Sequence, residues 1–481
     1  MNKVFVAILL ATALAAIEGT IVSTAIPSIT ADLSGVELIS WIYSAYLLTS
    51  AISAIIFGKL ADLLGRKKII IAGITIFLIG SLLCGMATSM GLLIVYRAIQ
   101  GIGAGSILPI TLTMVGELFK TEKERAKGQG YISMVWGVSG VIGPLIGGFI
   151  VDQLTWHFIF LLNIPFGIGT IILIAKYYQE EKIILSRKID YLGASFFSIG
   201  MMALLYSLIE GSNTQQWTTI TQCILYITAI VFLGIFIFVE NRTDEPIIPL
   251  TLFKNKRLNV INGLTLFCMA IVIGISAYLP IYAQSVLGKN ATEAGLMLTP
   301  LSVMWTVGAI LSSQLVGWIT NKRIIQIGTI LLVISTTMLM FLSSTTSPLF
   351  VFLATGILGT GMGFIAPMLI IAVQASSTEE QLGTAIGLNS FINTFSQSIG
   401  AAIFGVLFNI TTSHPLKEID AESINLNGSF DHTLFSAQQI HRIIEIIAGG
   451  IRSVYTGSFV FAVIAFILAI FISIKQSEEN E

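Results

Sequence analysis

The chain has 481 residues, of which 55% are hydrophobic and 11% are charged. Because ordinary soluble domains carry about 25% charged residues, this composition excludes a water-soluble globule. The formal net charge of -1 gives no information about partners, because the charges are sorted along the chain. The three cysteines lie within apolar runs, without the spacing of a disulfide framework or a metal site.

Fourteen apolar runs are long enough to cross a hydrocarbon layer of about 30 Å, which takes roughly 20 helical residues. In chain order they are 4–27, 38–58, 69–88, 91–115, 130–151, 156–176, 190–210, 219–240, 258–284, 293–317, 323–343, 346–373, 385–409 and 453–474. The first run holds Glu18 and continues too far for a signal peptide, so we interpret it as a span. The sequence predicts an all-α polytopic membrane protein with 14 transmembrane helices.

The cations alternate along the chain. Twenty of the 25 Lys and Arg residues lie in every second gap between the runs or at the two chain ends. Because Lys and Arg accumulate in cytoplasmic loops, we expect these gaps and both termini to face the cytoplasm. The sequence thus predicts a multi-pass protein of the cytoplasmic membrane.

The one sizeable gap, 410–452, is then expected on the extracellular side. Within it, Thr433–Ile447 has apolar residues at helical spacing. We interpret this stretch as a packed extracellular cap, with a substrate lid as the alternative.

A glycine motif occurs twice. Gly101, Gly103, Gly105 and Pro109 form G-x-G-x-G-x-x-x-P, and Gly359, Gly361, Gly363 and Pro367 repeat it 258 residues later. The offset spans eight helices, so the simplest organisation is two six-helix bundles with two helices inserted between them. The predicted parts are an N-terminal bundle (1–177), a two-helix linker (178–257) and a C-terminal bundle (258–481) that includes the loop 410–452. Parallel repeats of this kind place substrate sites near the membrane midplane, between the halves.

Glu18 is an acid at membrane depth, where insertion of a charge costs about 2.5–3.5 kcal/mol. Burial disfavours its charged form, so that protonation near neutral pH becomes accessible. A cationic drug would favour the ionised form and a proton would neutralise it, so the two ligands would compete for one group. The alternative is a structural glutamate bonded to neighbouring hydroxyls such as Thr20 or Ser23.

The basic gap after the second run reads G-K-L-A-D-L-L-G-R-K-K and resembles the cytoplasmic signature of the major facilitator superfamily. We expect Gly58 to allow close helix approach and Asp62 to hold a helix N-terminus or a guanidinium. Gly65 is expected to make the turn, and Arg66 to anchor at lipid headgroups. Leu63 departs from the signature, which commonly has a basic residue there. The alternative is a generic basic loop.

Arg97 lies in R-A-I-Q-G-I-G-A-G, which resembles the helix 4 signature of proton-coupled members of the superfamily. A buried guanidinium cannot shed its proton and therefore needs anionic or dipolar partners. We expect Arg97 to hold the Glu18 carboxylate indirectly, through water or Gln100, and to set when it protonates. The alternative is a fixed anchor for backbone carbonyls.

The fifth run contains G-V-S-G-V-I-G-P-L-I-G-G, which is similar to the antiporter signature of the same superfamily. The matching positions are Gly140, Gly143, Pro144, Gly147 and Gly148. Glycines remove side-chain bulk and Pro144 bends the helix, so we expect this helix to pivot against the opposite half. Close packing alone is the alternative.

Further stretches resemble the fourteen-helix drug:proton antiporter family, and this resemblance covers essentially the whole chain. They are 17–22, 25–27, 41–48 and 160–167, with Tyr282, Gln284, Gly288, Ala294, Gly295 and Pro300. The chain departs from that family at Glu18, where an aspartate is usual. It also departs at Asn389, Asn393 and Gln397, where some members have acids.

Aromatic and amide side chains are candidates for drug contact, because flat apolar cations stack on aromatic faces. Besides Glu18, the candidates are Trp41, Tyr46, Trp136, Tyr278, Tyr282, Asn389, Asn393 and Gln397. Ordinary contacts between helices are the alternative for the amides.

The resemblance implies a proton-coupled antiporter that exports amphipathic, often cationic, drugs by alternating access. No G-x-x-x-x-G-K-[ST] phosphate loop occurs, so ATP is not expected as the energy source. We expect no cofactor, no metal and no nucleic-acid partner. We expect the protein to contact the lipid bilayer and to be a monomer.

Three other functions stay open at this stage. Export of an endogenous lipid, metabolite or peptide would use the same fold. A membrane enzyme would need clustered catalytic groups, whereas the four histidines are dispersed. A channel would need polar rings around one pore, whereas the repeat and the glycine motif favour alternating access.

Overall fold

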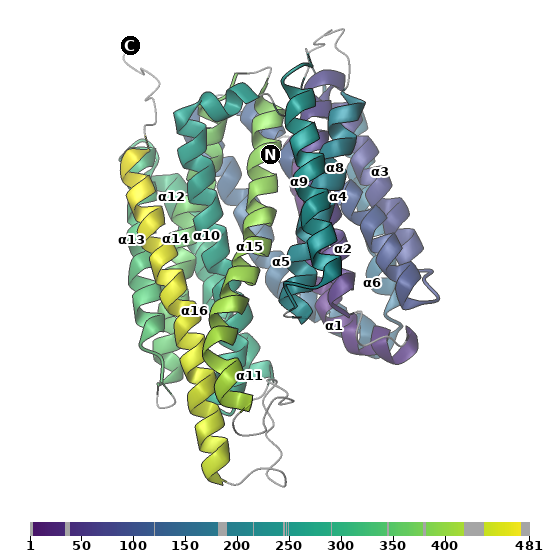
Figure 1. The fold of residues 1–481 in the computed structure, drawn as a ribbon. Helices are drawn as coiled ribbons and strands as arrows, with labels where there is room; N and C mark the ends of the chain where they lie inside the picture. Colours follow the sequence, from purple (N-terminus) through teal and green to yellow (C-terminus); the bar gives the residue numbers. More distant parts are fainter. Residues whose placement is uncertain are drawn as a thin grey trace. The chain divides into compact units, whose positions relative to one another are not determined.

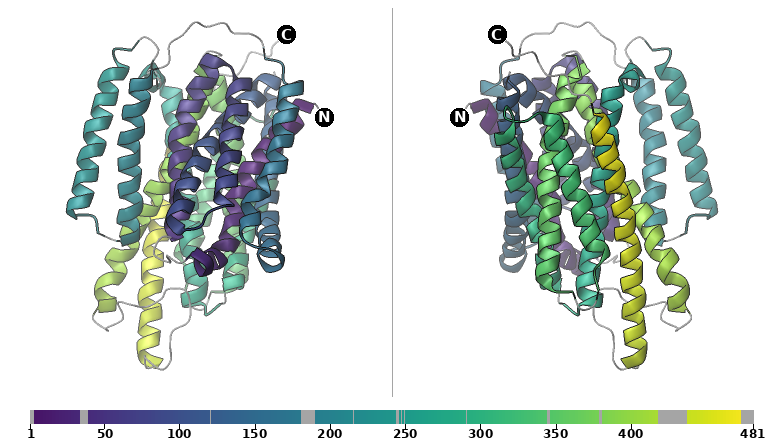
Figure 2. Two further views of the ribbon diagram at one scale, coloured as in Figure 1. Left: turned by 90° about the vertical axis from the view of Figure 1, so that its right-hand side faces the viewer. Right: turned by 90° about the vertical axis from the view of Figure 1, so that its left-hand side faces the viewer.

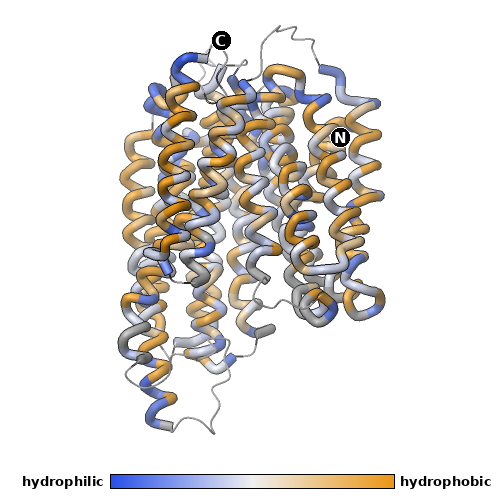
Figure 3. Tube along the Cα trace, turned by 45° about the vertical axis from the view of Figure 1, so that its right-hand side comes forward, coloured by the Kyte–Doolittle hydropathy of each residue, from blue (hydrophilic) through white to orange (hydrophobic). Residues whose placement is uncertain are grey.

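The computed structural model describes residues 3–33, 39–119, 121–180, 190–214, 216–243, 246, 248, 250–289, 291–343, 346–378, 381–417 and 437–472. In these ranges the chain is helical almost throughout and forms no β-strand. Hydrophobic residues make up long stretches of many helices, and hydrophilic residues gather near helix ends (Figure 3). Thirteen segments of the described chain are long and apolar enough to span a membrane. The prediction of an all-α, multi-pass membrane protein is confirmed.

The chain divides into two compact units (Figure 1). Unit 1 is formed by the described residues of Met1–Ser207, Thr218–Asn259 and Ile370–Thr394, and unit 2 by those of Leu208–Trp217, Val260–Leu369 and Phe395–Glu481. The helices of the first half are α1 (Lys3–Leu33), α2 (Ile39–Leu64), α3 (Arg66–Cys84), α4 (Met90–Leu118), α5 (Glu122–Gln153), α6 (His157–Leu161), α7 (Asn163–Tyr177), α8 (Tyr191–Thr214) and α9 (Ile220–Glu240). Those that follow are η2 (Leu250–Lys254), α10 (Lys256–Ile281), η3 (Tyr282–Val286), α11 (Ala291–Leu296), α12 (Thr299–Leu315), α13 (Asn321–Met340), α14 (Pro348–Ala375), α15 (Leu382–Lys417) and α16 (Ala437–Phe471).

The repeated glycine motif packs in the same way in both units. In unit 1, a Cβ atom on Gly101 would lie 2.3 Å from the Tyr46 carbonyl oxygen of α2, and one on Gly103 would lie 2.2 Å from the Phe77 nitrogen of α3. In unit 2, a Cβ atom on Gly359 would lie 2.2 Å from the Leu301 carbonyl oxygen of α12. The glycine two positions later, Gly361, likewise faces the backbone of α13. Each motif therefore lets one helix lie against two others at backbone distance.

Proline residues explain why some spans consist of two helices. The expected span 156–176 is broken at Leu162, between α6 and α7. Pro165 follows the break, and its ring would clash with the carbonyl four residues earlier in a continuous helix. Pro280 similarly precedes the π-helix η3. The first break is important for the site, because it places Asn163 at the start of α7.

Helices α8 and α9, which follow α7 along the chain, form a hairpin (Figure 2). Ser207 of α8 donates a hydrogen bond of 2.5 Å to Gln222 of α9, and both side chains are buried. Within unit 1, α8 also contacts α2, because the Tyr206 ring stacks on Trp41 at a centroid distance of 4.6 Å.

The predicted loop 410–452 is wrong in its bounds. Helix α15 continues to Lys417 and α16 begins at Ala437, so most of that segment is helical. The part of Thr433–Ile447 that the structure describes forms the first turns of α16 and is no separate cap. The reason is an unbroken apolar stripe: Ile440, Ile443, Ile447, Ile451 and Val454 are all buried along one helix.

Candidate functional site

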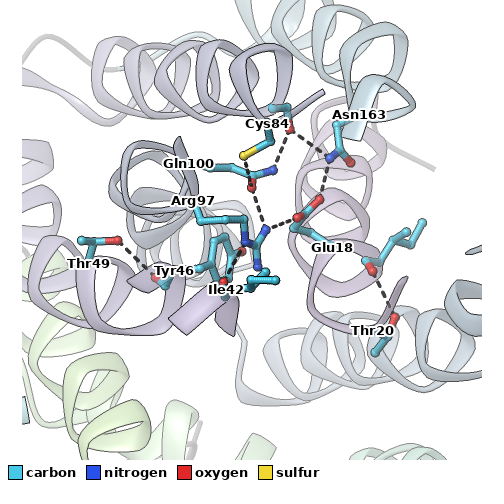
Figure 4. Close-up of polar contacts among 11 residues, drawn as sticks. Glu18, Thr20, Ile42, Tyr46, Thr49, Cys84, Arg97, Gln100 and Asn163 are labelled. Carbon is cyan, nitrogen blue, oxygen red and sulfur yellow. Dashed lines mark hydrogen bonds and ion pairs between the residues drawn. The ribbon is translucent and has the colours of Figure 1, made fainter. Parts of the chain in front are cut away.

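Glu18 lies on α1 inside unit 1, with 0% of its surface exposed. Its two carboxylate oxygens have different partners (Figure 4). Oε1 forms an ion pair with Nη1 of Arg97 from α4, which is itself 1% exposed. Oε2 accepts a hydrogen bond of 2.6 Å from Nδ2 of Asn163, the first residue of α7. Three helices therefore meet at one carboxylate.

The Arg97 guanidinium has several partners besides Glu18. Nη1 also donates to Oε1 of Gln100 at 2.7 Å, and Nε donates to the Ile42 carbonyl at 3.0 Å. The guanidinium lies 4.3 Å from the centre of the Tyr46 ring, a favourable cation–π distance. Removing a charge from water costs several kcal/mol, and good pairing and further hydrogen bonds are needed to offset that cost. This cluster supplies both.

The expected route from Arg97 to Glu18 needs a correction. The ion pair is direct rather than mediated by water or Gln100, because α1 and α4 pack closely enough for the two side chains to meet. The hydroxyl alternative for Glu18 is not supported at Thr20, which donates instead to the carbonyls of Ala16, Ile17 and Ser139. Ser23 lies outside the residues whose side chains are described.

A second layer of polar groups surrounds the pair (Figure 4). Ser81 Oγ of α3 accepts from Gln100 Nε2 at 2.7 Å and from Asn163 Nδ2 at 3.0 Å. The Cys84 thiol donates weakly to Gln100 Oε1 at 3.9 Å. The sequence interpretation assigned no role to Ser81 or Asn163. The available signal was a polar side chain within an apolar span, which in membranes marks a bundle interior.

An apolar groove of about 250 Å³ lies between α1 and α5. It is lined by Leu9, Ala13, Ile17, Tyr131, Met134, Val135, Val138, Ser139 and Ile142. Ile17 lines the groove, whereas the neighbouring Glu18 carboxylate contacts Arg97 and Asn163. The groove and the buried pair therefore lie on either side of α1.

Helix α5 closes on α1 through its glycine motif. Gly143 is buried, and a Cβ atom there would lie 2.1 Å from Thr20 Oγ1. Gly147 is buried as well, whereas a Cβ atom on Gly140 would meet nothing within 4 Å. The helix continues through Pro144 and Gly148, whose side-chain surroundings are outside the described part.

The motif from Gly58 to Lys68, which runs from the end of α2 into α3, contributes to a second polar cluster in unit 1. Asp62 caps the start of α15: its carboxylate accepts from the Gly383 and Thr384 backbone nitrogens at 3.0 and 2.8 Å and from the Thr384 hydroxyl at 2.9 Å. A Cβ atom on Gly58 would lie 2.6 Å from the Gly383 carbonyl oxygen. The expected roles of Gly58 and Asp62, close approach and capping of a helix, agree with these contacts.

Gly65 and Arg66 complete this cluster. Gly65 has φ +95° and joins α2 to α3. The Arg66 guanidinium pairs with Glu117 at the end of α4 and lies 3.7 Å from Asp62. Arg66 is thus buried and ion-paired rather than free to anchor at headgroups, which corrects the expectation. Glu180, which follows α7, accepts from the Arg66 backbone nitrogen at 2.5 Å.

Tyr178 ties the same cluster to the end of α7. Its hydroxyl donates to Glu117 at 2.9 Å. Burial, and then the negative charge of Glu180, raise the pKa of Tyr178 to about 12. The phenol therefore stays protonated at physiological pH and remains a donor to Glu117.

The other predicted drug contacts have varied surroundings. Trp41 stacks on Tyr206, and Tyr46 lies against Arg97. The Tyr278 ring packs against the Phe408 ring with a centroid distance of 5.3 Å, and the Tyr282 hydroxyl donates to the Ser343 carbonyl at 2.7 Å. Trp136 on α5 is 41% exposed. On α15, Asn389 is buried while Asn393 and Gln397 are half-buried. Among all these candidates, unit 1 brings Tyr46 together with Glu18 and Arg97.

A model of the Major Facilitator Superfamily matches residues 8–401. The chain belongs to this superfamily. Membership indicates a multi-pass membrane transporter rather than an enzyme. Within the described residues, no three His, Cys, Asp or Glu side chains are grouped as a metal site.

Relatives in the superfamily carry transporter names. The chain is 36% identical to the Multidrug transporter protein MdtP of Bacillus subtilis, over 84% of this chain and 74% of that one. It is 34% identical to Multidrug resistance protein 3 of the same species, over 94% and 87% of the two chains. The Multidrug efflux pump SdrM of Staphylococcus aureus is 30% identical over 84% of this chain and 89% of its own.

Solved structures share the fold at much lower identity. The human organic anion transporter MFSD10 superposes with a TM-score of 0.67 at 14% identity, covering 97% of this chain and 99% of that one. The proton:xylose symporter XylE superposes with a TM-score of 0.65 at 12% identity, covering 98% and 95%. These likenesses support the fold alone.

Proposed function

We propose that this protein exports amphipathic, often cationic, drugs across the cytoplasmic membrane in exchange for protons, and that Glu18 carries the proton. One observation supports this most: a fully buried carboxylate, paired with Arg97, lies on the helix that also lines an apolar groove. The names of the relatives MdtP and SdrM support drugs as the cargo.

The geometry favours coupling through α1 rather than direct competition for Glu18. Protonation removes the negative charge that holds α1 to Arg97, while the groove on the other side of α1 offers apolar surface to a drug. A drug that fits the groove when the ion pair is formed favours the ionised state, and a proton favours the other. By linkage, each ligand then lowers the affinity for the other.

Three structural proposals accompany this mechanism. Both termini face the cytoplasm, as the distribution of Lys and Arg suggests. Two six-helix bundles, 1–177 and 258–481, alternate access around the drug site, while 178–257 is an insertion. The transporter acts as a monomer without ATP. Reporter fusions at each terminus test the orientation.

Transport in proteoliposomes tests the function. A permanent lipophilic cation such as tetraphenylphosphonium is suitable, because it cannot be trapped as a weak base. We expect vesicles with an acidic lumen to accumulate it against its gradient, and a protonophore to abolish the accumulation. Uptake at the same rate with and without a pH gradient would contradict exchange of the cation for protons. Ohmic, non-saturable flux would indicate a channel.

A further inference from the structure

We propose that Asn163 is the positioning residue that senses the protonation state of Glu18. Its side-chain amide donates to the ionised carboxylate and turns over to accept from the protonated one. This inference depends on the proposed function, because it takes Glu18 as the proton carrier.

The arrangement of donors decides which oxygen takes the proton. Oε1 of Glu18 faces Arg97, whose guanidinium has donors only and keeps its charge. A proton on Oε1 would point at another donor. The proton therefore binds Oε2, the oxygen that faces Asn163 at 2.6 Å.

Protonation of Oε2 places the new O–H group against the Nδ2 donor of Asn163. A half-turn of the amide removes this conflict, because Oδ1 then accepts the hydrogen bond from Glu18. No covalent bond other than the new O–H bond forms, and none breaks. The added proton thus reverses the hydrogen bond between Glu18 and Asn163.

The neighbours of Asn163 permit this reversal and confine it to one amide. Gln100 cannot turn, since its Oε1 accepts from Arg97 at 2.7 Å. Its Nε2 therefore always donates to Ser81. Ser81 Oγ also accepts from Asn163 at 3.0 Å, and its hydroxyl hydrogen can rotate to donate once Asn163 presents Oδ1.

The other charged and titratable groups beside the carboxylate do not replace Asn163 in this role. Among the residues that the structure describes, they are Arg97 of α4, with the Tyr46 phenol of α2 beside it, and the Cys84 thiol of α3 behind Gln100. Arg97 remains cationic, and the phenol and thiol remain neutral in the pH range of transport.

The position of Asn163 gives the reversal a structural consequence. It begins α7 just after the break at Leu162, and it links Glu18 of α1 with Ser81 of α3. Proton binding therefore changes the hydrogen bonds that join α1, α3 and α7. A proton would loosen α1 from Arg97 and alter its link to α7 in the same step.

Infrared difference spectroscopy of the full-length protein in lipid nanodiscs tests this. Glu18→Gln identifies the carbonyl band of the protonated Glu18, and Asn163→Ser identifies the amide band of Asn163. In the wild type, we expect both bands to change over the same pH interval. In Asn163→Leu the carboxylate loses a donor, so the titration midpoint moves by about one pH unit toward higher pH.

Two further variants serve as controls for the effect of Asn163→Leu. Asn163→Ser retains a group that can both donate and accept, so the Glu18 midpoint in this variant should lie nearer to that of the wild type than the midpoint in Asn163→Leu does. If Asn163→Leu folds poorly, the simultaneous change of the two bands in the wild type still tests the proposal. Gln222→Leu removes a buried amide that is also bonded to a serine, but on α9, and leaves the midpoint unchanged. If Glu18 titrates with an unaltered midpoint in Asn163→Leu, or the amide band of the wild type stays constant over that pH interval, the role of Asn163 is refuted. If no Glu18 band titrates in the wild type, the proposed function itself fails.

Discussion

Thr20 of α1 lies against Gly143 of α5 so closely that a Cβ atom on the glycine would come within 2.1 Å of the threonine Oγ1. The threonine hydroxyl also donates to the Ser139 carbonyl, one turn earlier on α5, at 3.1 Å. Gly140, in the same motif, has open space where its Cβ atom would be. The two glycines therefore differ in what they do for the α1–α5 contact.

Gly143→Ala should push Thr20 away from α5 and slow drug turnover more than it weakens drug binding. Gly140→Ala is the matched control. It should leave turnover near that of the wild type and stabilise the helix by up to about 1 kcal/mol, since alanine is the better helix former. Turnover and binding in proteoliposomes measure both effects. Equal turnover in the two variants would show that the α1–α5 contact does not limit transport.

Arg97→Lys should reduce proton-coupled transport by about tenfold or more. A lysine ammonium has its three donors on one nitrogen, so it lacks the planar fork through which Nη1 and Nε of the guanidinium reach Glu18, Gln100 and the Ile42 carbonyl. The control is Arg125→Lys, where the Nε of the native arginine donates to the Phe119 carbonyl, away from Glu18. Comparable losses in both variants would mean that the fork geometry of Arg97 is unimportant.

Asp62→Asn should destabilise the folded protein by about 1–3 kcal/mol, because an amide offers one acceptor where the carboxylate serves three donors at the start of α15. Thr384→Val removes only the hydroxyl donor and should cost less. Thermal unfolding, with hydrogen exchange at the Gly383 and Thr384 amides, measures the loss. Unchanged exchange at these two amides in Asp62→Asn would argue against the cap.

Gly65→Ala should be more harmful than Gly317→Ala. Both residues have positive φ, +95° and +94°, so alanine costs about 1–2 kcal/mol at either position. At Gly65 the added Cβ atom would also lie 2.6 Å from a carboxylate oxygen of Glu180 and displace it from the start of α3, whereas at Gly317 nothing lies within 4 Å. Melting temperatures of the two variants compare the costs directly. Identical losses would indicate that Glu180 moves aside freely.

Much of the fold follows from the sequence because membrane spans are long apolar runs, and fourteen such runs are visible in it. Loop bounds were harder to predict. The predicted loop 410–452 includes Arg442, Glu445 and Arg452, which lie on α16, a helix of 35 residues. At 1.5 Å per residue such a helix is longer than a hydrocarbon layer of about 30 Å, so its polar turns need no loop.

The site was predictable in its residue types but not in its pairing. Glu18 and Arg97 are conspicuous because charges are rare in apolar spans. Whether they touch depends on how α1 and α4 pack, which periodicity does not encode. Asn163 is 145 residues from Glu18 along the chain. It lies in the stretch 160–167, which we used only for its resemblance to the antiporter family. The break before it, however, could be expected from Pro165.

In the proposed mechanism, drug binding changes the protonation of Glu18. This change is tested most directly by adding tetraphenylphosphonium to the purified protein in weakly buffered solution and recording protons released to the medium. The wild type should release protons, since the drug favours the ionised carboxylate paired with Arg97. Glu18→Gln should still bind the cation, because glutamine keeps an acceptor for Arg97, but should release none. Proton release from Glu18→Gln equal to that of the wild type would show that Glu18 is not the proton carrier.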